Sequence, residues 1–289
     1  MKIGVSATFL APLSTPQFVA DFGRNAEAAG LDSIWMGEHV VLFERTEFPY
    51  PGSVDGKLSV PPGVGMLDIV ATFGFLAAAT KTLRFGTGIA LISQRNPIYT
   101  AKEFATLDWL SGGRVDFGIG VGWCKEEVLG CGYSWEDRGA RSDEFLELVT
   151  SLWTQPVTRY EGKHFQLAEC RMDPKPIQRP HLPILVGGHT AHAFRRAARY
   201  GSGWYGFGIG PEQTAQTLQR LDTALAAEGR TRDGFEIVIT PPPTQATDEM
   251  LRAYADLGVD RVVLELGSQE ADAVAAKLKE LERFARLAA

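Results

Sequence analysis

The 289-residue sequence lacks the cysteine patterns and long apolar runs that mark disulfide-rich, zinc-binding and membrane proteins. Its three cysteines, Cys124, Cys131 and Cys170, form no C-x-x-C pair, which argues against a disulfide framework and favours a reducing cytoplasm. Glycine or charge interrupts every apolar run well short of the roughly 20 residues that a membrane span needs. Residues 1–5 enter a strand-like run without the regions of a signal peptide. We therefore expect a soluble, cytoplasmic protein.

The sequence also has no excess of positive charge. Its formal net charge is −6 and its pI is about 5.5. Nucleic acids and anionic membranes are bound by basic faces, so we expect neither as a partner. The hydrophobic content of 45% is enough for one large core. Chains of about 250 residues commonly form one α/β barrel, and we expect a single domain over residues 1–289.

Two common catalytic signatures are missing. The sequence has no G-x-S-x-G nucleophile elbow and no Cys–His signature. Gly118, Gly120 and Gly122 resemble a dinucleotide-binding loop, but G-x-G-x-x-G would need glycine where Trp123 or Lys125 stands. These glycines predict instead either room for a flat ligand or a tight barrel corner.

Short, β-branched runs bounded by glycine alternate with amphipathic helical segments along the whole chain. Several runs are apolar almost throughout, which is typical of strands covered on both faces. Their number matches a closed (β/α)₈ TIM barrel of the α/β class, with a doubly wound open sheet as the alternative. The predicted strands are residues 2–9, 33–37, 83–91, 114–120, 183–187, 203–206, 235–240 and 261–266.

Two segments are too long for ordinary barrel loops. Residues 40–65 are rich in proline, glycine and aromatic residues, and residues 154–182 end in a proline-rich run. Long loops in a compact domain are usually functional lids or disordered. The aromatic residues favour ordered insertion loops at the C-terminal face of the strands, where barrel active sites form.

The fifth predicted strand ends in Gly187 and Gly188 and runs through His189 and Thr190 into a helix. Paired glycines let backbone N–H groups approach a ligand, and a helix N-terminus favours an anion. The motif predicts a phosphate cradle, to which Thr190 adds a hydroxyl. A tight strand-to-helix turn is the alternative.

His39 follows the second predicted strand, next to Glu38, and is the best candidate for proton transfer. A structural hydrogen-bonding role is the alternative. A metal site would combine this pair with His189 and His192. We expect no metal, because those two histidines are three apart at a helix start and no strand supplies a histidine pair.

Longer segments resemble the luciferase-like monooxygenase superfamily. They are residues 83–97, 105–123, 174–180, 183–188 and 195–204, and the resemblance spans essentially the whole chain. Within the superfamily the sequence is most similar to the coenzyme F420-dependent oxidoreductases. The run Gly37-Glu38-His39 and the aromatic, proline-rich loop after it support that branch.

The resemblance implies where a deazaflavin cofactor would bind. A bulge with a non-prolyl cis peptide would back its central ring at Gly88-Ile89. Trp123 stands where sugar-phosphate dehydrogenases of the superfamily carry a catalytic glutamate, so an apolar or aromatic substrate is expected instead. The implied catalytic residues are His39 and Glu38, and the implied cofactor contacts are His39, Gly88, Ile89, Val121, Glu126, Val186, Gly187, Gly188, His189 and Thr190.

The leading prediction is an oxidoreductase that transfers a hydride between coenzyme F420 and a small organic substrate. His39 would exchange the proton and Glu38 would orient it. The alternatives are an FMN-dependent monooxygenase that uses O₂ with a separate reductase, and a non-catalytic flavin-binding protein. Basic residues for the carboxylates of the F420 tail would be Lys175, Arg179, Arg195 and Arg196.

The resemblance also implies a homodimer. Phe104, Leu107 and Trp109 are apolar residues of one helical segment, and they predict either part of such an interface or ordinary core packing.

Overall fold

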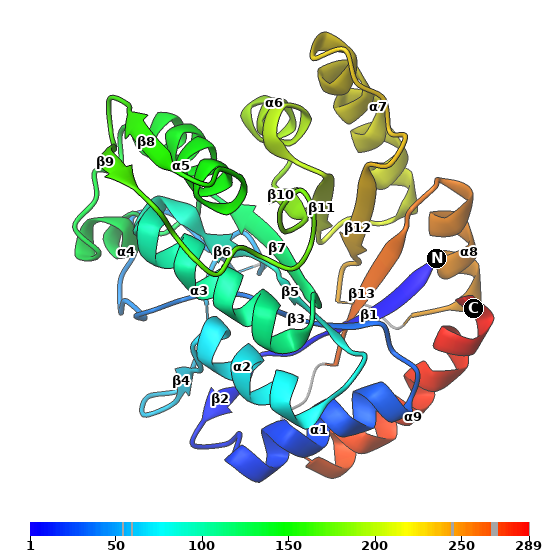
Figure 1. The fold of residues 1–289 in the computed structure, drawn as a ribbon. Helices are drawn as coiled ribbons and strands as arrows, with labels where there is room; N and C mark the ends of the chain where they lie inside the picture. Colours follow the sequence, from blue (N-terminus) through cyan, green and yellow to red (C-terminus); the bar gives the residue numbers. More distant parts are fainter. Residues whose placement is uncertain (54, 59, 244–245, 267–270, 289) are drawn as a thin grey trace.

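The computed structural model describes residues 1–289 except 54, 59, 244–245, 267–270 and 289. Eight parallel strands form a closed barrel inside a ring of helices (Figure 1). Hydrogen bonding between β10 and β7 closes the barrel, which confirms the predicted TIM barrel over the open sheet. The barrel strands are β1 (Lys2–Ser6), β3 (Ser33–Met36), β5 (Arg84–Thr87), β7 (Val115–Gly120), β10 (Ile184–Gly187), β11 (Gly203–Phe207), β12 (Glu236–Thr240) and β13 (Arg261–Glu265).

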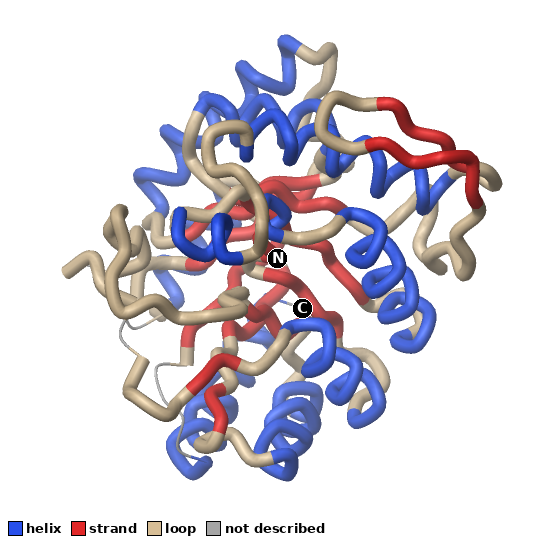
Figure 2. Tube along the Cα trace, turned by 90° about the vertical axis from the view of Figure 1, so that its left-hand side faces the viewer, coloured by secondary structure: helices blue, strands red, loops and turns tan. Residues whose placement is uncertain are grey.

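The helices cover the outside of the barrel, and Figure 2 shows the strands at the centre of the helical ring. The first helix begins as its sequence predicts, since the Thr15 side chain accepts from the Phe18 amide and Pro16 occupies the first turn. Gly30 ends that helix with a φ of 73°. The helices are α1 (Pro16–Ala28), α2 (Ile69–Ala79), α3 (Pro97–Ser111), α4 (Lys125–Gly130), α5 (Arg138–Thr154), α6 (Ala191–Tyr200), α7 (Pro211–Ala227), α8 (Asp248–Asp256) and α9 (Ala271–Ala288).

The third predicted strand is divided into β5 and β6 (Ala90–Leu91) by a cis peptide between Gly88 and Ile89. This confirms the bulge that the resemblance implies. The glycines of β7 make room for it. A Cβ atom on Gly118 would lie 1.9 Å from the Thr87 carbonyl oxygen, and one on Gly120 would lie 1.9 Å from Ile89 Cδ1. The expectation of empty space for a flat ligand at these two glycines is therefore wrong, because the bulge fills it.

Side chains that alternate along each strand fill the barrel interior in layers. At the N-terminal ends, Arg261 donates to Asp116 over 2.7 Å, and both side chains are buried. Above them Trp35 stacks on Tyr205 with ring centroids 5.3 Å apart. Among the described residues, these two layers therefore fill the lower part of the barrel interior.

The two insertions differ in their placement. Residues 40–65 lead to β4 (Gly65–Met66), which pairs with β2 (Leu10–Ala11). In residues 154–182, β8 (Thr158–Glu161) and β9 (Gln166–Cys170) form a hairpin whose tip is held by Glu144 of α5. The rest of that insertion runs back to the N-terminal ends of the strands, where Gln178 contacts Arg84. Among the described residues, no helix is both long and apolar enough to cross a membrane.

Candidate active site

The barrel brings the predicted site residues to one end of the molecule. Glu38 and His39 follow β3, the Gly88-Ile89 bulge follows β5, and Trp123 follows β7. The glycine pair lies at the end of β10. Because the carboxyl ends of parallel strands meet at one face of a closed barrel, segments far apart in the sequence converge there.

His39 is held by a carboxylate that the sequence analysis missed. Its Nδ1 lies 2.8 Å from Glu127 Oε2, and the Glu127 side chain is fully buried. The other oxygen of Glu127 accepts the Val40 amide over 2.6 Å. Since the carboxylate only accepts, Nδ1 must carry the hydrogen, and Nε2 of the neutral ring is left with a lone pair. Such an arrangement can orient a histidine as a general base.

Glu38 does not orient His39, and that expectation is wrong. Its carboxylate accepts from the Leu91 amide over 2.7 Å and pairs with Arg95 over 2.6 Å. The two neighbouring side chains have different partners, since His39 contacts Glu127. Glu38 instead ties the end of β3 to the first residues after the bulge. Arg95 also binds Glu103 over 3.0 Å, which anchors this link on α3.

Val121 and Glu126, two further predicted cofactor contacts, bond to other parts of the protein. The Val121 carbonyl accepts from Ser93 over 2.6 Å, which joins the end of β7 to the 3₁₀ turn Ile92–Gln94. Glu126 accepts the Glu47 amide over 2.7 Å and so holds the first insertion against α4. Partial burial opposes ionisation of Glu126, but backbone hydrogen bonds lower its pKa. The carboxylate thus has a protein partner within the site.

Two aromatic residues cover the site beside His39. The Trp123 ring centroid lies 5.9 Å from that of His39 and 5.4 Å from that of Tyr50, which comes from the first insertion. Within the described part of the chain, the buried Trp123 Nε1 and Gln94 Nε2 have no hydrogen-bond partner. Buried donors are rarely left unpaired, so these two are candidate donors to polar atoms of a ligand.

The segment after β10 is the predicted anion site. Gly188 has a φ of 111°, and Thr190 caps α6 by accepting the Ala193 amide over 3.2 Å. No acceptor in the described residues takes the amide hydrogens of Gly188, His189 or Thr190. Burial lowers the pKa of His189, and its Nε2 lies 3.1 Å from the Phe207 carbonyl oxygen. The His189 ring is therefore engaged elsewhere, and its backbone amide is the group that remains available for an anion.

Most of the basic residues predicted to bind the F420 tail lie away from the glycine pair. Lys175 donates to the Leu152 carbonyl at the C-terminal end of α5, and Arg179 donates to the Pro176 carbonyl in the same returning segment. Both lie near the N-terminal ends of the strands. Arg196 is buried and pairs with Asp143 over 2.7 Å. Of the four residues only Arg195, which is exposed on α6, is available near the cradle.

The far wall of the barrel mouth carries polar groups that the sequence analysis did not single out. Tyr205 Oη lies 2.6 Å from Thr240 Oγ1. Glu265 is the last residue of β13, which neighbours the strand of Thr240. The pKa of Tyr50 is raised mainly because Tyr50 is buried, and to a smaller extent by the charge of Glu265. These residues lack a local motif, and only the alternation of inward side chains along the strands would have marked them.

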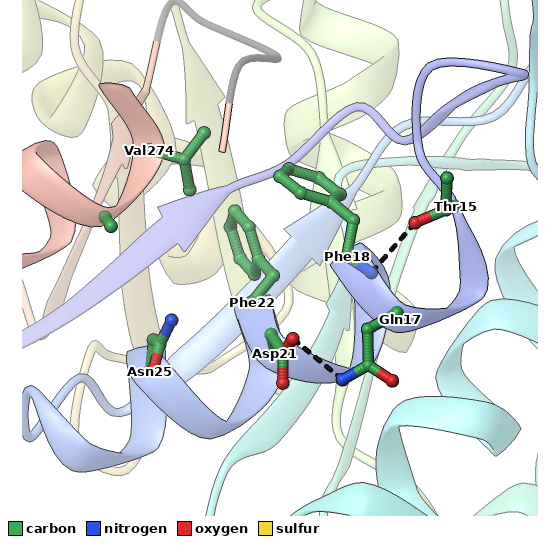
Figure 3. A pocket seen from close by; sticks show the side chains of 8 residues that line it. Thr15, Gln17, Phe18, Asp21, Phe22, Asn25 and Val274 are labelled. Atoms are coloured by element: carbon green, nitrogen blue, oxygen red, sulfur yellow. Dashed lines mark hydrogen bonds between the residues drawn. The ribbon is translucent and has the colours of Figure 1, made fainter. Parts of the chain in front are cut away.

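Other candidate sites carry less chemistry. The described residues contain no group of three or more His, Cys, Asp or Glu side chains that could hold a metal ion. A hollow of about 260 Å³ lies outside the barrel between α1 and α9 (Figure 3). Three of its polar side chains are already bonded within α1, where Gln17 donates to Asp21 and Thr15 caps the helix. The hollow is therefore separate from the strand-end site.

The fold defines a (β/α)₈-barrel protein, and the polar groups that converge at the carboxyl ends of its strands form its candidate functional site. The family model of the luciferase-like monooxygenases matches residues 1–287. The chain belongs to that family, whose members are oxidoreductases and monooxygenases.

Similar proteins include users of both candidate cofactors. A Mycobacterium tuberculosis protein of unassigned function is 32% identical over 261 residues, 89% of this chain and 90% of its own length. An F420-dependent glucose-6-phosphate dehydrogenase of Amycolatopsis mediterranei is 28% identical over 71% of this chain and 56% of its own. An FMNH₂-dependent dimethylsulfone monooxygenase of Pseudomonas putida is 35% identical over 45% of this chain and 36% of its own.

The fold is also similar to that of a solved F420-dependent secondary alcohol dehydrogenase in complex with an F420–acetone adduct. The two chains share 17% identity over 100% of this chain and 99% of the other, with a TM-score of 0.79.

Proposed function

We propose that this oxidoreductase transfers a hydride between coenzyme F420 and a small organic substrate. The observation that carries the proposal is the His39–Glu127 pair, which lies at the same end of the barrel as the bulge and the glycine pair. The F420-dependent dehydrogenase among its relatives supports the choice of cofactor.

The residues present fit a phosphate-bearing tricyclic cofactor. The free amides of Gly188, His189 and Thr190 would hold the phosphate, assisted by the N-terminus of α6. Gly88 and Ile89 would back the ring, and Trp123 Nε1 offers an unpaired donor at its edge. The remaining contacts we assign are Val121, Glu126, Val186 and Gly187.

When bound, F420 supplies a ring carbon that accepts or donates a hydride. His39 Nε2 would take the proton that the substrate loses in that step and return it in the opposite direction. Glu127 would keep the ring in the required tautomer, and Glu38 with Arg95 would hold the backbone after the bulge in place. Tyr50 and Trp123 would exclude water from the reacting atoms.

The second candidate is an FMN-dependent monooxygenase that receives reduced flavin from a separate reductase. The same cradle would bind the FMN phosphate. The specific observation in its favour is the loss of Lys175, Arg179 and Arg196 as partners for the acidic F420 tail. The FMNH₂-dependent relative supports it as well.

Fluorescence titration of the cofactor-free protein with F420 and with FMN distinguishes the two. We expect saturable binding of F420 that is at least about tenfold tighter than that of FMN, a difference of about 1.4 kcal/mol. Saturable binding of FMN alone would contradict the F420 proposal. Binding of neither would contradict both enzymatic candidates.

A further inference from the structure

The side chain of Ile89 occupies a slot between two barrel strands. Gly120 ends β7 and Gly187 ends β10, and the parallel register of these two strands places the glycines side by side. A Cβ atom on Gly120 would lie 1.9 Å from Ile89 Cδ1, and one on Gly187 would lie 3.0 Å from Ile89 Cγ2. A side chain on Gly120 would therefore displace the end of Ile89, and one on Gly187 would press on a different methyl group.

The space beneath this slot is already filled. Ile89 packs against a buried cluster in the barrel interior, which consists of Trp35, Leu185, Tyr205, Val238 and Val263. Tyr205 stacks on Trp35, and its Oη lies 2.6 Å from Thr240 Oγ1, which holds this ring in place. Because protein interiors are close-packed, a displaced Ile89 side chain would move toward the mouth of the barrel and not into the core.

Gly88, the residue before Ile89, rests on the same cluster. A Cβ atom on Gly88 would lie 2.9 Å from Tyr205 Oη. At the other end of the bulge, the Leu91 amide donates to Glu38 over 2.7 Å. The bulge is therefore held from below at Gly88, from the side at Ile89 and at its end at Leu91.

We propose that Gly120 and Gly187 are positioning residues: the slot between them seats Ile89 and thereby fixes the position of the cofactor ring. The inference rests on the proposed function in taking Gly88 and Ile89 as the support of that ring. Glycine in a strand often marks the close approach of another segment, and here that segment is the bulge. Since reacting atoms must lie within about 3–3.5 Å of each other, a shift of the ring by about 1 Å would slow hydride transfer by roughly 10²-fold.

Moving one methyl group from residue 89 to residue 120 tests the slot. Gly120→Ala adds the carbon that meets Ile89 Cδ1, and Ile89→Val removes Cδ1 while it keeps Cγ2. We expect Gly120→Ala to lower the thermal unfolding midpoint of the cofactor-free protein by at least about 3 °C. It should also weaken F420 binding, measured by fluorescence titration, at least about tenfold. Adding Ile89→Val should restore most of both losses.

Two further variants are matched controls. Gly187→Ala should also weaken F420 binding, because its Cβ meets Ile89 Cγ2. Valine retains that atom, so Ile89→Val should not restore this loss. Gly65→Ala, in β4, should leave the unfolding midpoint and the F420 affinity unchanged, because a Cβ atom there meets nothing within 4 Å.

Three results would overturn the slot: wild-type values for Gly120→Ala, no recovery when Ile89→Val is added, or equal recovery of Gly187→Ala. If Gly120→Ala does not fold, a folded double variant gives the same support. An F420 affinity that never changes, with a rescued unfolding midpoint, would overturn the positioning role.

Failure of the proposed function gives a different result. A wild type that binds FMN alone would contradict the F420 proposal, while a tenfold loss of FMN affinity in Gly120→Ala would still support the positioning role. A wild type that binds neither cofactor would overturn both proposals. Normal F420 binding by Gly120→Ala would overturn the positioning role alone.

Discussion

Glu127 decides which nitrogen of His39 carries the hydrogen. Its two oxygens accept from different donors, the His39 ring and the Val40 amide. The ring can exchange its tautomer, whereas the amide can only donate. In Glu127→Gln the side-chain oxygen should therefore stay with the amide and the NH₂ group should face His39. We expect the ring to change from the Nδ1–H to the Nε2–H tautomer.

Nitrogen–proton correlation NMR of the histidine rings above pH 8 measures this change. His181, whose Nδ1 contacts the Leu182 carbonyl oxygen, serves as an internal control that should not change. With Nε2 protonated, His39 loses its role as a base, and turnover should fall by roughly 10²-fold or more. An unchanged His39 tautomer in Glu127→Gln would show that Glu127 does not orient the ring.

The site shows what local sequence can and cannot predict. His39 was found because it follows a strand whose end is recognisable. Glu127 was missed because it lies 88 residues away, on a short helix whose place depends on barrel closure. The family resemblance instead indicates its neighbour Glu126 as a cofactor contact. Adjacent residues of a helix point about 100° apart, so a one-residue difference changes the partner completely.

At the scale of elements, the turn between α2 and β5 is fixed by a carboxylate from α1. Glu27 Oε1 accepts from the amides of Lys81, Thr82 and Leu83, at 2.8, 2.5 and 3.1 Å. Partial burial acts to raise the pKa of Glu27, but these hydrogen bonds lower it from 4.5 to about 2. The ionised group therefore stabilises the fold.

Glu27→Gln should lower the free energy of unfolding at pH 7 by roughly 1 kcal/mol, the net contribution of one ordinary hydrogen bond, because the site is partly exposed to solvent. A carboxyl group whose pKa is lowered in the folded state stabilises the fold fully at pH values above its unfolded-state pKa. This stabilisation is lost as the pH falls through the folded-state pKa. The difference between wild type and variant should thus shrink between pH 4.5 and about 2. Urea denaturation across this range measures it. A difference that stays constant with pH would exclude the charge of Glu27 as its origin.

The strands were the most predictable elements, because alternation with helices and glycine boundaries marks them locally. The division of residues 83–91 into two strands was expected only from the resemblance. Nothing in a short window shows that Glu38, far upstream, bonds the Leu91 amide. The course of residues 154–182 was harder still. Its hairpin depends on Glu144, and its return depends on Asp108, which accepts the Ile177 amide.

At the scale of the whole molecule, one face of α3 carries exposed apolar residues. Trp109 is 57% exposed and Leu110 70%, and Ile98 and Tyr99 lie eleven residues before them, on the same side of the helix. Phe104 and Leu107 are buried in the core, so of the three residues considered for an interface only Trp109 is accessible. Exposed apolar patches commonly mark contacts between proteins.

We expect this face to lie in the homodimer interface that the family resemblance implies. Trp109→Glu combined with Leu110→Glu should convert a dimer into a monomer without unfolding it, because neither side chain is in the core. Light scattering after size exclusion gives the mass. Leu129→Glu, at an exposed apolar residue on α4, should leave the dimer intact. A monomeric wild type, or a dimeric double variant, would contradict this assignment.

The central claim is that one end of the barrel holds the cofactor phosphate at Gly188, His189 and Thr190 and its ring beside His39. A crystal structure of the protein with F420 tests it most directly. We predict phosphate oxygens within about 3 Å of those amide nitrogens and the ring against Gly88 and Ile89, with His39 Nε2 directed at the space above it. A phosphate bound elsewhere, or a ring that makes no contact with the bulge, would contradict the account.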